Sequence, residues 1–409
     1  MKLPYDPQTC TYLGTTTGKR PVFIADNAKN AFVCGTTGSG KTIVLSNFIK
    51  KRFPTLIIDG KGDTGAGSLL DIVQKMKGNK KVYVINMTDP AHSDKYNPFR
   101  NASPTIAKDM LINLTDWSEE HYKLNTERYL QRLVQLLHIA EIPLNFQNII
   151  KYMATEQFKA LSATLLHAEL LTKADHAMNT ELVKSSGRIA ENALARFATI
   201  AESELGQIFD DSGIDIYTAM QENAIILFIL NPLLYPELSP LIGRLITIDS
   251  KKAISRLYQS GNGRIFFIMD EINVYASTAL VDLVNKSRSA NVTCILATQS
   301  LSDLDAAVNE AYKEQIIENC NNYIVLRQNS SINAEHWANI LGTKETLEVT
   351  YQLQQKGGAG TTETGYGSAK RVREYLYHPD DIKSLQTGKG IFLSRDLNTH
   401  CKINIHKPF

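Results

Sequence analysis

The fold of this chain can be inferred from Ala31-Phe32-Val33-Cys34-Gly35-Thr36-Thr37-Gly38-Ser39-Gly40-Lys41-Thr42. An apolar run, residues 31–34, leads directly into a sequence that fits the pattern G-x-x-x-x-G-K-[ST], with an extra glycine at Gly38. Residues 43–49 follow with the apolar spacing of a helix. A strand, a glycine-rich turn and a helix in this order are the context that a phosphate-binding loop requires. The sequence therefore predicts a nucleotide site here.

The residue types of this loop suit the binding of a triphosphate. Its glycines let successive backbone N–H groups turn inward around phosphate oxygens, and the start of the following helix favours negative charge. We expect Lys41 to reach the β- and γ-phosphates of ATP, and the Thr42 hydroxyl to bind Mg²⁺. A glycine-rich turn with an incidental lysine is the competing interpretation, which the order of the elements disfavours. The predicted nucleotide-binding residues are Gly35, Thr36, Thr37, Gly38, Ser39, Gly40, Lys41 and Thr42.

A pair of acids follows the apolar run of residues 265–269. A site that hydrolyses a nucleotide needs a carboxylate to hold the metal and a group to orient the attacking water. We assign Asp270 to Mg²⁺, through water, and Glu271 to the polarisation of the nucleophilic water. Taken alone, two acids could equally be the solvated end of a strand or a helix N-cap. Together with the phosphate loop they predict an ATPase.

Two further polar side chains are candidates for catalysis. Gln299 follows the apolar run of residues 294–298, and ligands of parallel sheets bind beyond the carboxyl ends of the strands. It is therefore placed to sense the γ-phosphate, although a glutamine could also simply begin a surface loop. Arg288 is a candidate arginine finger for a neighbouring subunit's site, where its delocalised cation would offset transition-state charge. Arginines are common on helix surfaces, so this residue alone is a weak signal.

The segment Asp59-Gly60-Lys61-Gly62-Asp63 also follows an apolar run. Its glycines permit a tight turn that would present Lys61 and Asp63 towards the same crevice. An ordinary surface turn explains the same residues equally well, and the sequence does not separate the two interpretations.

The alternation of short β-branched runs with helical patterns predicts an α/β fold with a mostly parallel sheet covered on both faces. Strand patterns stop between Asn86 and Ala224, where apolar residues recur at helical spacing and Ser103 is a candidate N-cap. We predict a sheet domain in two parts, residues 1–100 and 210–409, with an all-helical domain at 101–209 inserted between them. A Gly/Thr-rich tract, residues 356–368, suggests a loop or a long hairpin. The predicted strands are Ala31–Cys34, Thr55–Ile58, Lys81–Asn86, Ala224–Leu230, Arg264–Met269, Thr293–Thr298, Tyr323–Leu326 and Gly390–Ser394.

Composition restricts the class of protein. The 409 residues are 43% apolar and 21% charged, as in an ordinary folded chain. No apolar run approaches the ~20 residues of a membrane span, and the five cysteines include no Cys-x-x-Cys pair, which favours a reducing compartment. A net charge of +2 neither requires nor excludes a nucleic-acid partner. We expect a cytoplasmic protein.

The ensemble resembles the type IV secretion coupling proteins (TraG/TraD-like) of the FtsK/HerA group of RecA-like motors. The resemblance extends from about residue 12 to the C-terminus, and the combination of the phosphate loop with a helical insertion makes it specific. The segments that carry it are the phosphate loop, Asp59-Gly60-Lys61-Gly62-Asp63, Tyr96-Asn97-Pro98-Phe99, residues 200–206, Phe267-Ile268-Met269-Asp270-Glu271, Leu296-Ala297-Thr298-Gln299-Ser300 and residues 377–382.

The resemblance implies a homo-hexameric ring that hydrolyses ATP with Mg²⁺ at its subunit interfaces. Such a ring moves DNA, gripped through its phosphates, together with a relaxase or another protein substrate, towards the components of a type IV secretion channel. By position, Gln299 matches the family's third motif and Arg288 its finger arginine. The helical block resembles the all-alpha domain that meets the relaxase or substrate.

The chain departs from the family pattern in one respect. Most coupling proteins begin with transmembrane helices, whereas the 34 residues before Gly35 contain no apolar span. Either the sequence is a truncated form, or the anchor lies in a partner, or this is a soluble member of the group. We expect a cytoplasmic protein that a partner could hold at the inner face of the cell membrane. The alternatives are an ATP-binding adaptor that recruits secretion substrates, and a soluble HerA/FtsK-like DNA pump. Glu271 disfavours the adaptor, because an adaptor has no need of a residue that orients water.

Overall fold

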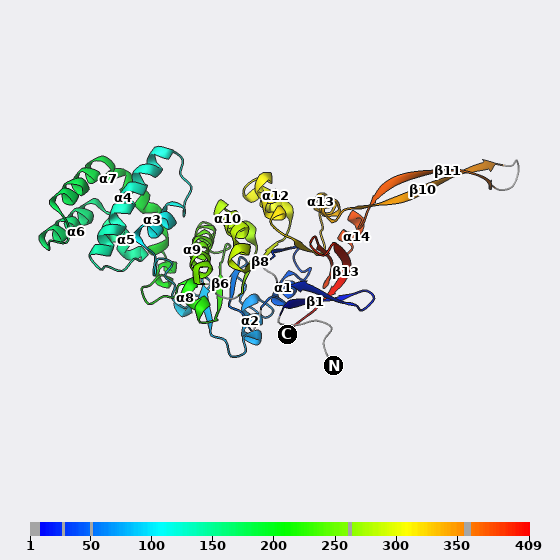
Figure 1. Cartoon of the computed structure of the whole chain (residues 1–409), viewed down its shortest axis with the longest axis horizontal. Coiled ribbons are helices and arrows are strands. Elements are labelled where there is room, and N and C mark those ends of the chain that lie inside the picture. Colours follow the sequence, from blue (N-terminus) through cyan, green and yellow to red (C-terminus); the bar gives the residue numbers. More distant parts are fainter. Residues whose placement is uncertain (1–8, 27–28, 50–51, 261–263, 356–360) are drawn as a thin grey trace.

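A computed structural model describes residues 9–26, 29–49, 52–260, 264–355 and 361–409 (Figure 1). Its centre is an 11-stranded mixed sheet with the strand order β2-β1-β13-β12-β9-β3-β8-β7-β4-β6-β5. The seven strands from β9 to β5 are parallel, and the four at the other end of the sheet are antiparallel. The strands of this sheet are β1 (Cys10–Thr16), β2 (Pro21–Ala25), β3 (Ala31–Cys34), β4 (Thr55–Asp59), β5 (Val82–Asn86), β6 (Ile225–Ile229), β7 (Ile265–Asp270), β8 (Val292–Thr298), β9 (Asn322–Val325), β12 (Lys389–Ser394) and β13 (Thr399–Ile405).

The central strands are buried along their whole length because helices cover both faces of the sheet. Every residue of β3, β4, β6, β7 and β8 is buried, and their side chains divide between two hydrophobic clusters. Continuous apolar runs of this kind are typical of parallel strands. The helices associated with the sheet are α1 (Lys41–Ser46), α2 (Leu69–Met76), η1 (Pro90–His92), α9 (Leu238–Ser260), η3 (Ile272–Tyr275), α10 (Thr278–Ser287), η4 (Arg288–Ala290), α11 (Leu301–Ala307), α12 (Glu310–Glu318), α13 (Ser331–Leu341) and α14 (Pro379–Lys383).

The structure confirms the predicted α/β class and all eight predicted strands, with ends that shift by a few residues. It adds β1, β2 and β13 at the antiparallel end of the sheet, which are only partly buried and lack a continuous apolar run. The helix after the phosphate loop is shorter than its pattern suggested. It ends at Ser46, where Asn47 follows as the C-cap and uses its side-chain amide to donate to the carbonyls of Ile43 and His406.

A helical insertion separates β5 from β6, as predicted, and lies at one end of the molecule (Figure 1). Ser103 caps its first helix, accepting a hydrogen bond from the Ile106 N–H. Its apolar side chains join the cluster that covers one face of the sheet, so the insertion and the sheet share a hydrophobic core. The domain boundaries at 101 and 209 remain a prediction. The helices of this region are α3 (Pro104–Ile112), α4 (Glu120–Ile139), α5 (Phe146–Met153), α6 (Thr155–His167), α7 (Lys173–Ala201), η2 (Glu204–Ile208) and α8 (Ile216–Gln221).

The two connections to this insertion pair with each other. Tyr96, on the entering segment, forms isolated β-bridges with Phe209 and Ile214 on the returning segment. The buried Tyr96 hydroxyl donates to Asp249 of α9 at 2.8 Å, and Asp249 lies 2.8 Å from the buried ammonium of Lys252. Breaking a buried, hydrogen-bonded charge pair is costly, so α9 holds the junction in place.

A second sheet of two strands forms a long arm that extends from the opposite end of the molecule (Figure 1). It consists of β10 (Thr343–Gln355) and β11 (Thr361–Tyr375), paired antiparallel. Of the Gly/Thr-rich tract, residues 361–368 belong to β11, which confirms the hairpin interpretation for them, whereas residues 356–360 lie outside the described part of the chain. Among the described residues, no helix combines the length and apolarity that crossing a bilayer demands.

We predict that Gly213→Ala destabilises the junction of the insertion. An added Cβ would lie 2.5–2.7 Å from the backbone C, N and Cα atoms of Tyr96, so the backbone must move. The expected loss in the free energy of unfolding is about 1–3 kcal/mol, measured by denaturant titration. Gly18→Ala is the matched control, because the nearest atom to its Cβ is the Thr16 hydroxyl at 3.8 Å. Equal stability of the two variants would contradict the close approach at Tyr96.

Candidate nucleotide site

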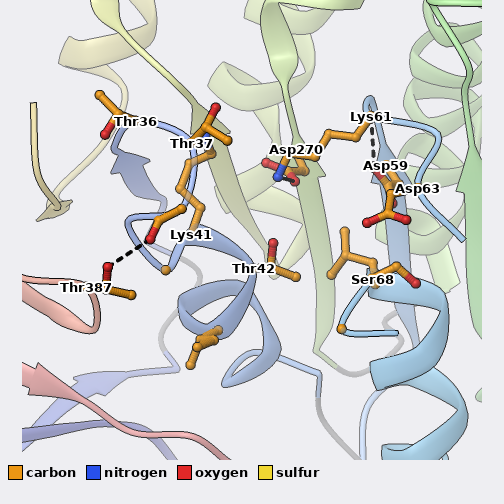
Figure 2. A pocket seen from close by; sticks show the side chains of 15 residues that line it. Thr36, Thr37, Lys41, Thr42, Asp59, Lys61, Asp63, Ser68, Asp270 and Thr387 are labelled. Carbon is orange, nitrogen blue, oxygen red and sulfur yellow. Dashed lines mark hydrogen bonds and ion pairs between the residues drawn. The ribbon is translucent and has the colours of Figure 1, made fainter. Parts of the chain in front are cut away.

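A pocket of about 300 Å³ lies at the carboxyl ends of the central strands (Figure 2). The strand order places β8 between the phosphate-loop strand β3 and the acid-bearing strand β7, with β4 beyond it. The loops after β3, β7 and β4 therefore open into one crevice, as expected for a parallel sheet. The pocket is lined by Thr36, Thr37, Gly38, Gly40, Lys41, Thr42, Ile43, Asp59, Lys61, Asp63, Gly67, Ser68, Leu69, Asp270 and Thr387.

The predicted phosphate loop forms a compact turn between β3 and α1. Gly38 and Gly40 have φ angles of 75° and 111°, in a region that side chains with a Cβ rarely adopt, so these two positions require glycine. Ser39 is buried and donates its hydroxyl to the Thr36 carbonyl at 2.6 Å, which closes the turn. The loop is anchored to a neighbouring strand end, because the Thr36 N–H donates to the Arg327 carbonyl at 3.0 Å.

Lys41 is held inside this loop. Its side chain is 3% exposed, and its ammonium donates to the Gly35 carbonyl at 2.8 Å. The same ammonium lies 3.3 Å from Oε1 of Glu271. A lysine is rarely buried unless it is paired, and here both partners belong to the site itself. The structure therefore brings the loop lysine and the second predicted acid into contact.

Asp270 and Glu271 occupy the end of β7 and the turn that follows it. Asp270 is fully buried, and its Oδ1 accepts a hydrogen bond from the Glu271 N–H at 3.1 Å. Glu271 adopts a left-handed conformation, φ 50° and ψ 54°, which is strained for a residue with a Cβ and is common at functional sites. Burial raises the pKa of Glu271, as does the charge of Asp270, while Lys41 and Lys61 act in the opposite direction.

Gln299 connects the phosphate loop to Glu271. Its side-chain amide donates to Glu271 Oε1 at 3.2 Å, and its carbonyl oxygen accepts from the Thr37 hydroxyl at 3.0 Å. The end of β8 thus places a polar side chain between the loop and the acid. This is the position from which a glutamine can respond to a bound phosphate.

The turn that the sequence left open, residues 59–63, faces the site. Lys61 and Asp63 both line the pocket, and the Lys61 ammonium lies 2.8 Å from Asp270 and 3.7 Å from Glu271. A Cβ on Gly60 would lie 2.8 Å from the Cβ of Glu271, so only glycine lets the two turns come this close. Gly62 has a φ of 75°. The close approach to Glu271 at position 60 and the positive φ at position 62 explain why both positions are glycine.

Arg288 lies away from the pocket. It is exposed at the end of α10, ahead of the start of β8, whereas Gln299 follows the end of the same strand. A strand of seven residues is roughly 23 Å long, so Arg288 and the phosphate loop are at opposite edges of the sheet. Within one chain the structure does not bring Arg288 to the site.

Several pocket residues had no signal in the sequence. Thr387 donates its hydroxyl to the Gly38 carbonyl at 3.1 Å, and the Gly388 N–H donates to the Ser39 carbonyl at 3.2 Å. A segment near the C-terminus therefore buttresses the phosphate loop. Ser68, the N-cap of α2, lines the opposite wall. These contacts join loops that are far apart in the sequence, so no local sequence pattern predicts them.

The donor groups of the pocket suit a magnesium ion. Thr42 supplies a hydroxyl, and Asp59 and Asp270 supply carboxylates from paired positions of β4 and β7. Negative charge accumulates in the pocket. Burial and the charge of Asp270 raise the pKa of Asp59 to about 7. Mg²⁺ is usually held by one or two carboxylates together with phosphate and water oxygens. Thr42 and Asp270 would hold the ion, leaving its other positions to a nucleotide and water.

The chain is similar to a known protein family over nearly its whole length. A model described as the type IV secretion-system coupling protein DNA-binding domain matches residues 15–406. The chain belongs to this family. An uncharacterized protein of Mycoplasma pneumoniae is 31% identical over 105 residues, which are 26% of this chain and 70% of that protein.

Solved structures of the coupling protein TrwB are similar in fold. The unbound TrwBdeltaN70 has a TM-score of 0.67 at 15% identity, over 97% of this chain and 89% of that one. TrwB in complex with ADP and Mg²⁺ has a TM-score of 0.66 at 16% identity, with the same coverage. VirB4 of Thermoanaerobacter pseudethanolicus has a TM-score of 0.61 at 13% identity, over 98% of this chain and 97% of that one. These likenesses confirm the α/β fold with a helical insertion.

We predict that Asp59→Asn changes how stability depends on pH. The folded carboxyl has a pKa of about 7, whereas an ordinary aspartate has a pKa of 3.8, so the wild type progressively loses stability from this group as pH rises from about 4 to 7. The variant should therefore be more stable than the wild type at pH 7.5, by on the order of 3 kcal/mol, and similar to it at pH 4.

Thermal or denaturant unfolding without nucleotide or divalent metal measures this difference. Asp71→Asn is the control with the opposite sign, because hydrogen bonds from Lys75 and the Gly67 N–H lower the pKa of that exposed carboxyl. If the difference in stability between Asp59→Asn and the wild type did not change with pH, this would contradict the raised pKa of Asp59 that burial and the charge of Asp270 cause.

Proposed function

We propose that this protein is an ATP-hydrolysing motor that moves DNA and couples it, with an attached relaxase or protein substrate, to a type IV secretion channel. The observation that carries this proposal is the convergence of Lys41, Glu271 and Gln299 around one phosphate loop in a chain of the coupling protein family. The nucleotide and Mg²⁺ held by TrwB, a protein of the same fold, support the choice of cofactors.

The contacts of the site suggest how its residues act. Lys41 would exchange the Gly35 carbonyl for the β- and γ-phosphates, while the backbone N–H groups of residues 35–42 surround them. Thr42 and Asp270 would hold Mg²⁺, which neutralises charge on the phosphates when bound. Glu271, released by Lys41, would orient the attacking water. Gln299, which contacts both Glu271 and Thr37, would signal the presence of the γ-phosphate.

The proposal includes assembly into a homo-hexameric ring. Arg288 is exposed at the edge of the sheet opposite the phosphate loop, so it can reach a nucleotide only in a neighbouring subunit. A guanidinium supplied in trans would offset transition-state charge. DNA in such a ring would be held mainly through its phosphates, with an affinity that falls as salt rises. We place the ring in the cytoplasm, held at the inner membrane face by a channel component.

Two alternatives remain distinct from this motor. An adaptor would bind ATP and recruit secretion substrates without turning ATP over. The hydrogen bonds and charges that converge on Glu271 favour hydrolysis, because they position a carboxylate that an adaptor does not use. A HerA/FtsK-like pump would hydrolyse ATP and move DNA but would not serve a secretion channel.

ATP turnover measured with and without single-stranded and duplex DNA separates these functions. The motor requires turnover that DNA stimulates, together with six-membered rings in negative-stain images with an ATP analogue and DNA. Turnover that does not respond to DNA would favour the adaptor. A secretion channel component that binds the ring and raises turnover further would separate the coupling function from that of a free DNA pump.

We predict that Glu271→Gln binds ATP but leaves it largely unhydrolysed. The substitution keeps the hydrogen bond from Gln299 and removes the charge that polarises water, so turnover should fall by about 10²–10⁴-fold. Lys41→Ala is the contrasting variant and should lose nucleotide binding itself. Binding is followed with a fluorescent nucleotide and turnover by phosphate release. Wild-type turnover in Glu271→Gln would show that this residue does not have the assigned role.

We predict that Arg288→Ala impairs turnover across a subunit interface. Arg288→Ala subunits alone should bind ATP normally and hydrolyse it slowly, and Lys41→Ala subunits should not bind it. When the two are mixed, some interfaces combine an intact Lys41 with an intact Arg288, so turnover should recover in part. Phosphate release at several mixing ratios measures the recovery. Mixtures no more active than the sum of their parts would leave Arg288 without a role in trans.

A further inference from the structure

We propose that Lys61 is the resident cation of the metal site, which pairs with Asp270 when no metal is bound and is displaced from it by the metal. This inference rests on the proposed function, because it concerns the same carboxylates that would hold Mg²⁺. It adds a positioning residue that acts on the metal through Asp270, and it gives a specific function to the turn of residues 59–63.

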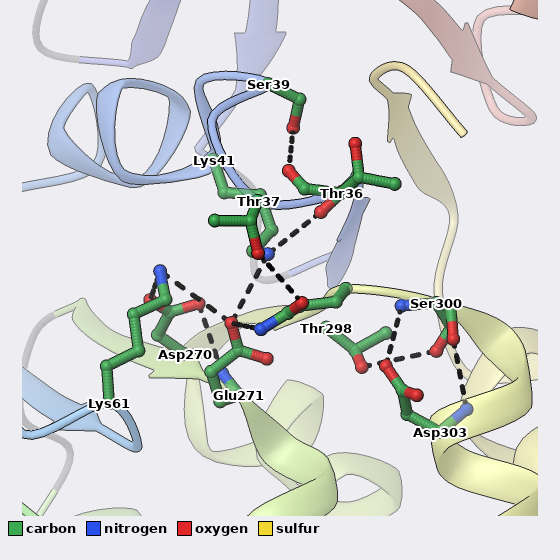
Figure 3. A network of polar contacts seen from close by, with 12 residues as sticks. Thr36, Thr37, Ser39, Lys41, Lys61, Asp270, Glu271, Thr298, Ser300 and Asp303 are labelled. Carbon is green, nitrogen blue, oxygen red and sulfur yellow. Dashed lines mark hydrogen bonds and ion pairs between the residues drawn. The ribbon is translucent and has the colours of Figure 1, made fainter. Parts of the chain in front are cut away.

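The geometry makes Lys61 a substitute for a metal ion. Its ammonium donates to Oδ2 of the fully buried Asp270 at 2.8 Å and lies 3.7 Å from Oε1 of Glu271 (Figure 3). It therefore sits between the two acids that a catalytic metal site requires. The Lys61 ammonium and Mg²⁺ would compete for the same carboxylate oxygens, since a carboxylate that binds a metal cannot keep a full ion pair with an ammonium.

The charge balance of the pocket explains why a cation is needed there. Three buried acids, Asp59, Asp270 and Glu271, face two lysines, Lys41 and Lys61. Lys41 is bound to the Gly35 carbonyl and to Glu271, so it does not neutralise Asp270. Without Lys61, the paired carboxylates of β4 and β7 would be left next to each other with no cation on Asp270. An uncompensated buried charge is strongly unfavourable.

Lys61 is also able to leave. Its side chain is 33% exposed, whereas that of Lys41 is 3% exposed. Glycines flank it on both sides: Gly60 permits the close approach to Glu271, and Gly62 supplies a φ of 75°. A compact ammonium on a flexible four-carbon chain can swing from Asp270 towards solvent or towards a phosphate without movement of the strands. The alternative is a fixed structural clamp between β4 and β7, in which Lys61 stays on Asp270 at all times.

Metal affinity distinguishes the two. In the presence of saturating ADP, Mn²⁺ is titrated and its binding is followed by electron paramagnetic resonance, which requires no turnover. If Lys61 competes with the metal, Lys61→Met should bind Mn²⁺ about tenfold more tightly than the wild type. Lys61→Arg should remain close to the wild type because it restores the charge. Lys75→Met, which removes a lysine paired with Asp71 on the exposed side of α2, should not change Mn²⁺ affinity.

A fixed clamp predicts a different pattern. Lys61→Met would then lower the unfolding temperature and bind Mn²⁺ no more tightly than the wild type, and this result would overturn the proposal. Failure of the wild type to bind ADP would instead overturn the proposed function, so the two failures are distinguishable.

A second measurement uses the wild-type chain and does not depend on a variant that folds. Acetylation of Lys61 by acetic anhydride, read by mass spectrometry, should be several-fold faster with Mn²⁺ and ADP than with ADP alone, with Lys75 as the internal standard. An unchanged rate at Lys61 would mean that its ammonium stays on Asp270 when the metal binds, contrary to the proposal.

Discussion

Hydrophobic burial of the parallel strands fixes where their carboxyl ends lie, and with them the geometry of the site. Cys34 is paired with Thr298, and Asp59 with Asp270, so four neighbouring strands stop at nearly the same level. Each strand is buried throughout, and a shift of register would remove apolar side chains from both faces at once. The polar groups that follow the strands are therefore held close together. Their mutual contacts, from Lys41 to Glu271 and from Lys61 to Asp270, follow from hydrophobic packing beneath them.

The helical insertion depends on the same sheet through α9. Its entering and returning segments pair at Tyr96, whose hydroxyl reaches Asp249 of that helix. At the other side, Gly243 of α9 lies against Tyr275, and the Tyr275 hydroxyl donates to the Asp270 carbonyl at 3.3 Å. One helix therefore contacts the turn after the acid pair as well as the junction. The turn after the acid pair is therefore connected to the junction of the helical insertion through one packed helix.

The sequence predicted the parts that local pattern encodes. Buried strands appear as apolar runs, the phosphate loop has a motif, and Ser103 is a recognisable N-cap, so all of these were located correctly. The candidate site residues were expected to lie together, and Lys41, Asp270 and Gln299 all contact Glu271, while their roles in catalysis stay predictions. Thr387 was missed because its contact with Gly38 spans most of the chain, and the direction in which Lys61 points depends on two glycines fitting against a distant turn. Arg288 illustrates the remaining limit, since a role between subunits has no signature within one chain.

The arm formed by β10 and β11 affects how the protein behaves in solution. Among the residues that the structure describes, each of its strands pairs only with the other, so along both outer edges the backbone N–H and C=O groups have no described strand as partner. Such ribbons readily add a strand from another molecule, which leads to aggregation unless something opposes it. Opposite charges face each other across the ribbon, as in the pairs Lys344/Glu374 and Glu348/Lys370, and a slipped or foreign strand would lose this match. The charges along the arm therefore disfavour pairing with a foreign strand or in a shifted register.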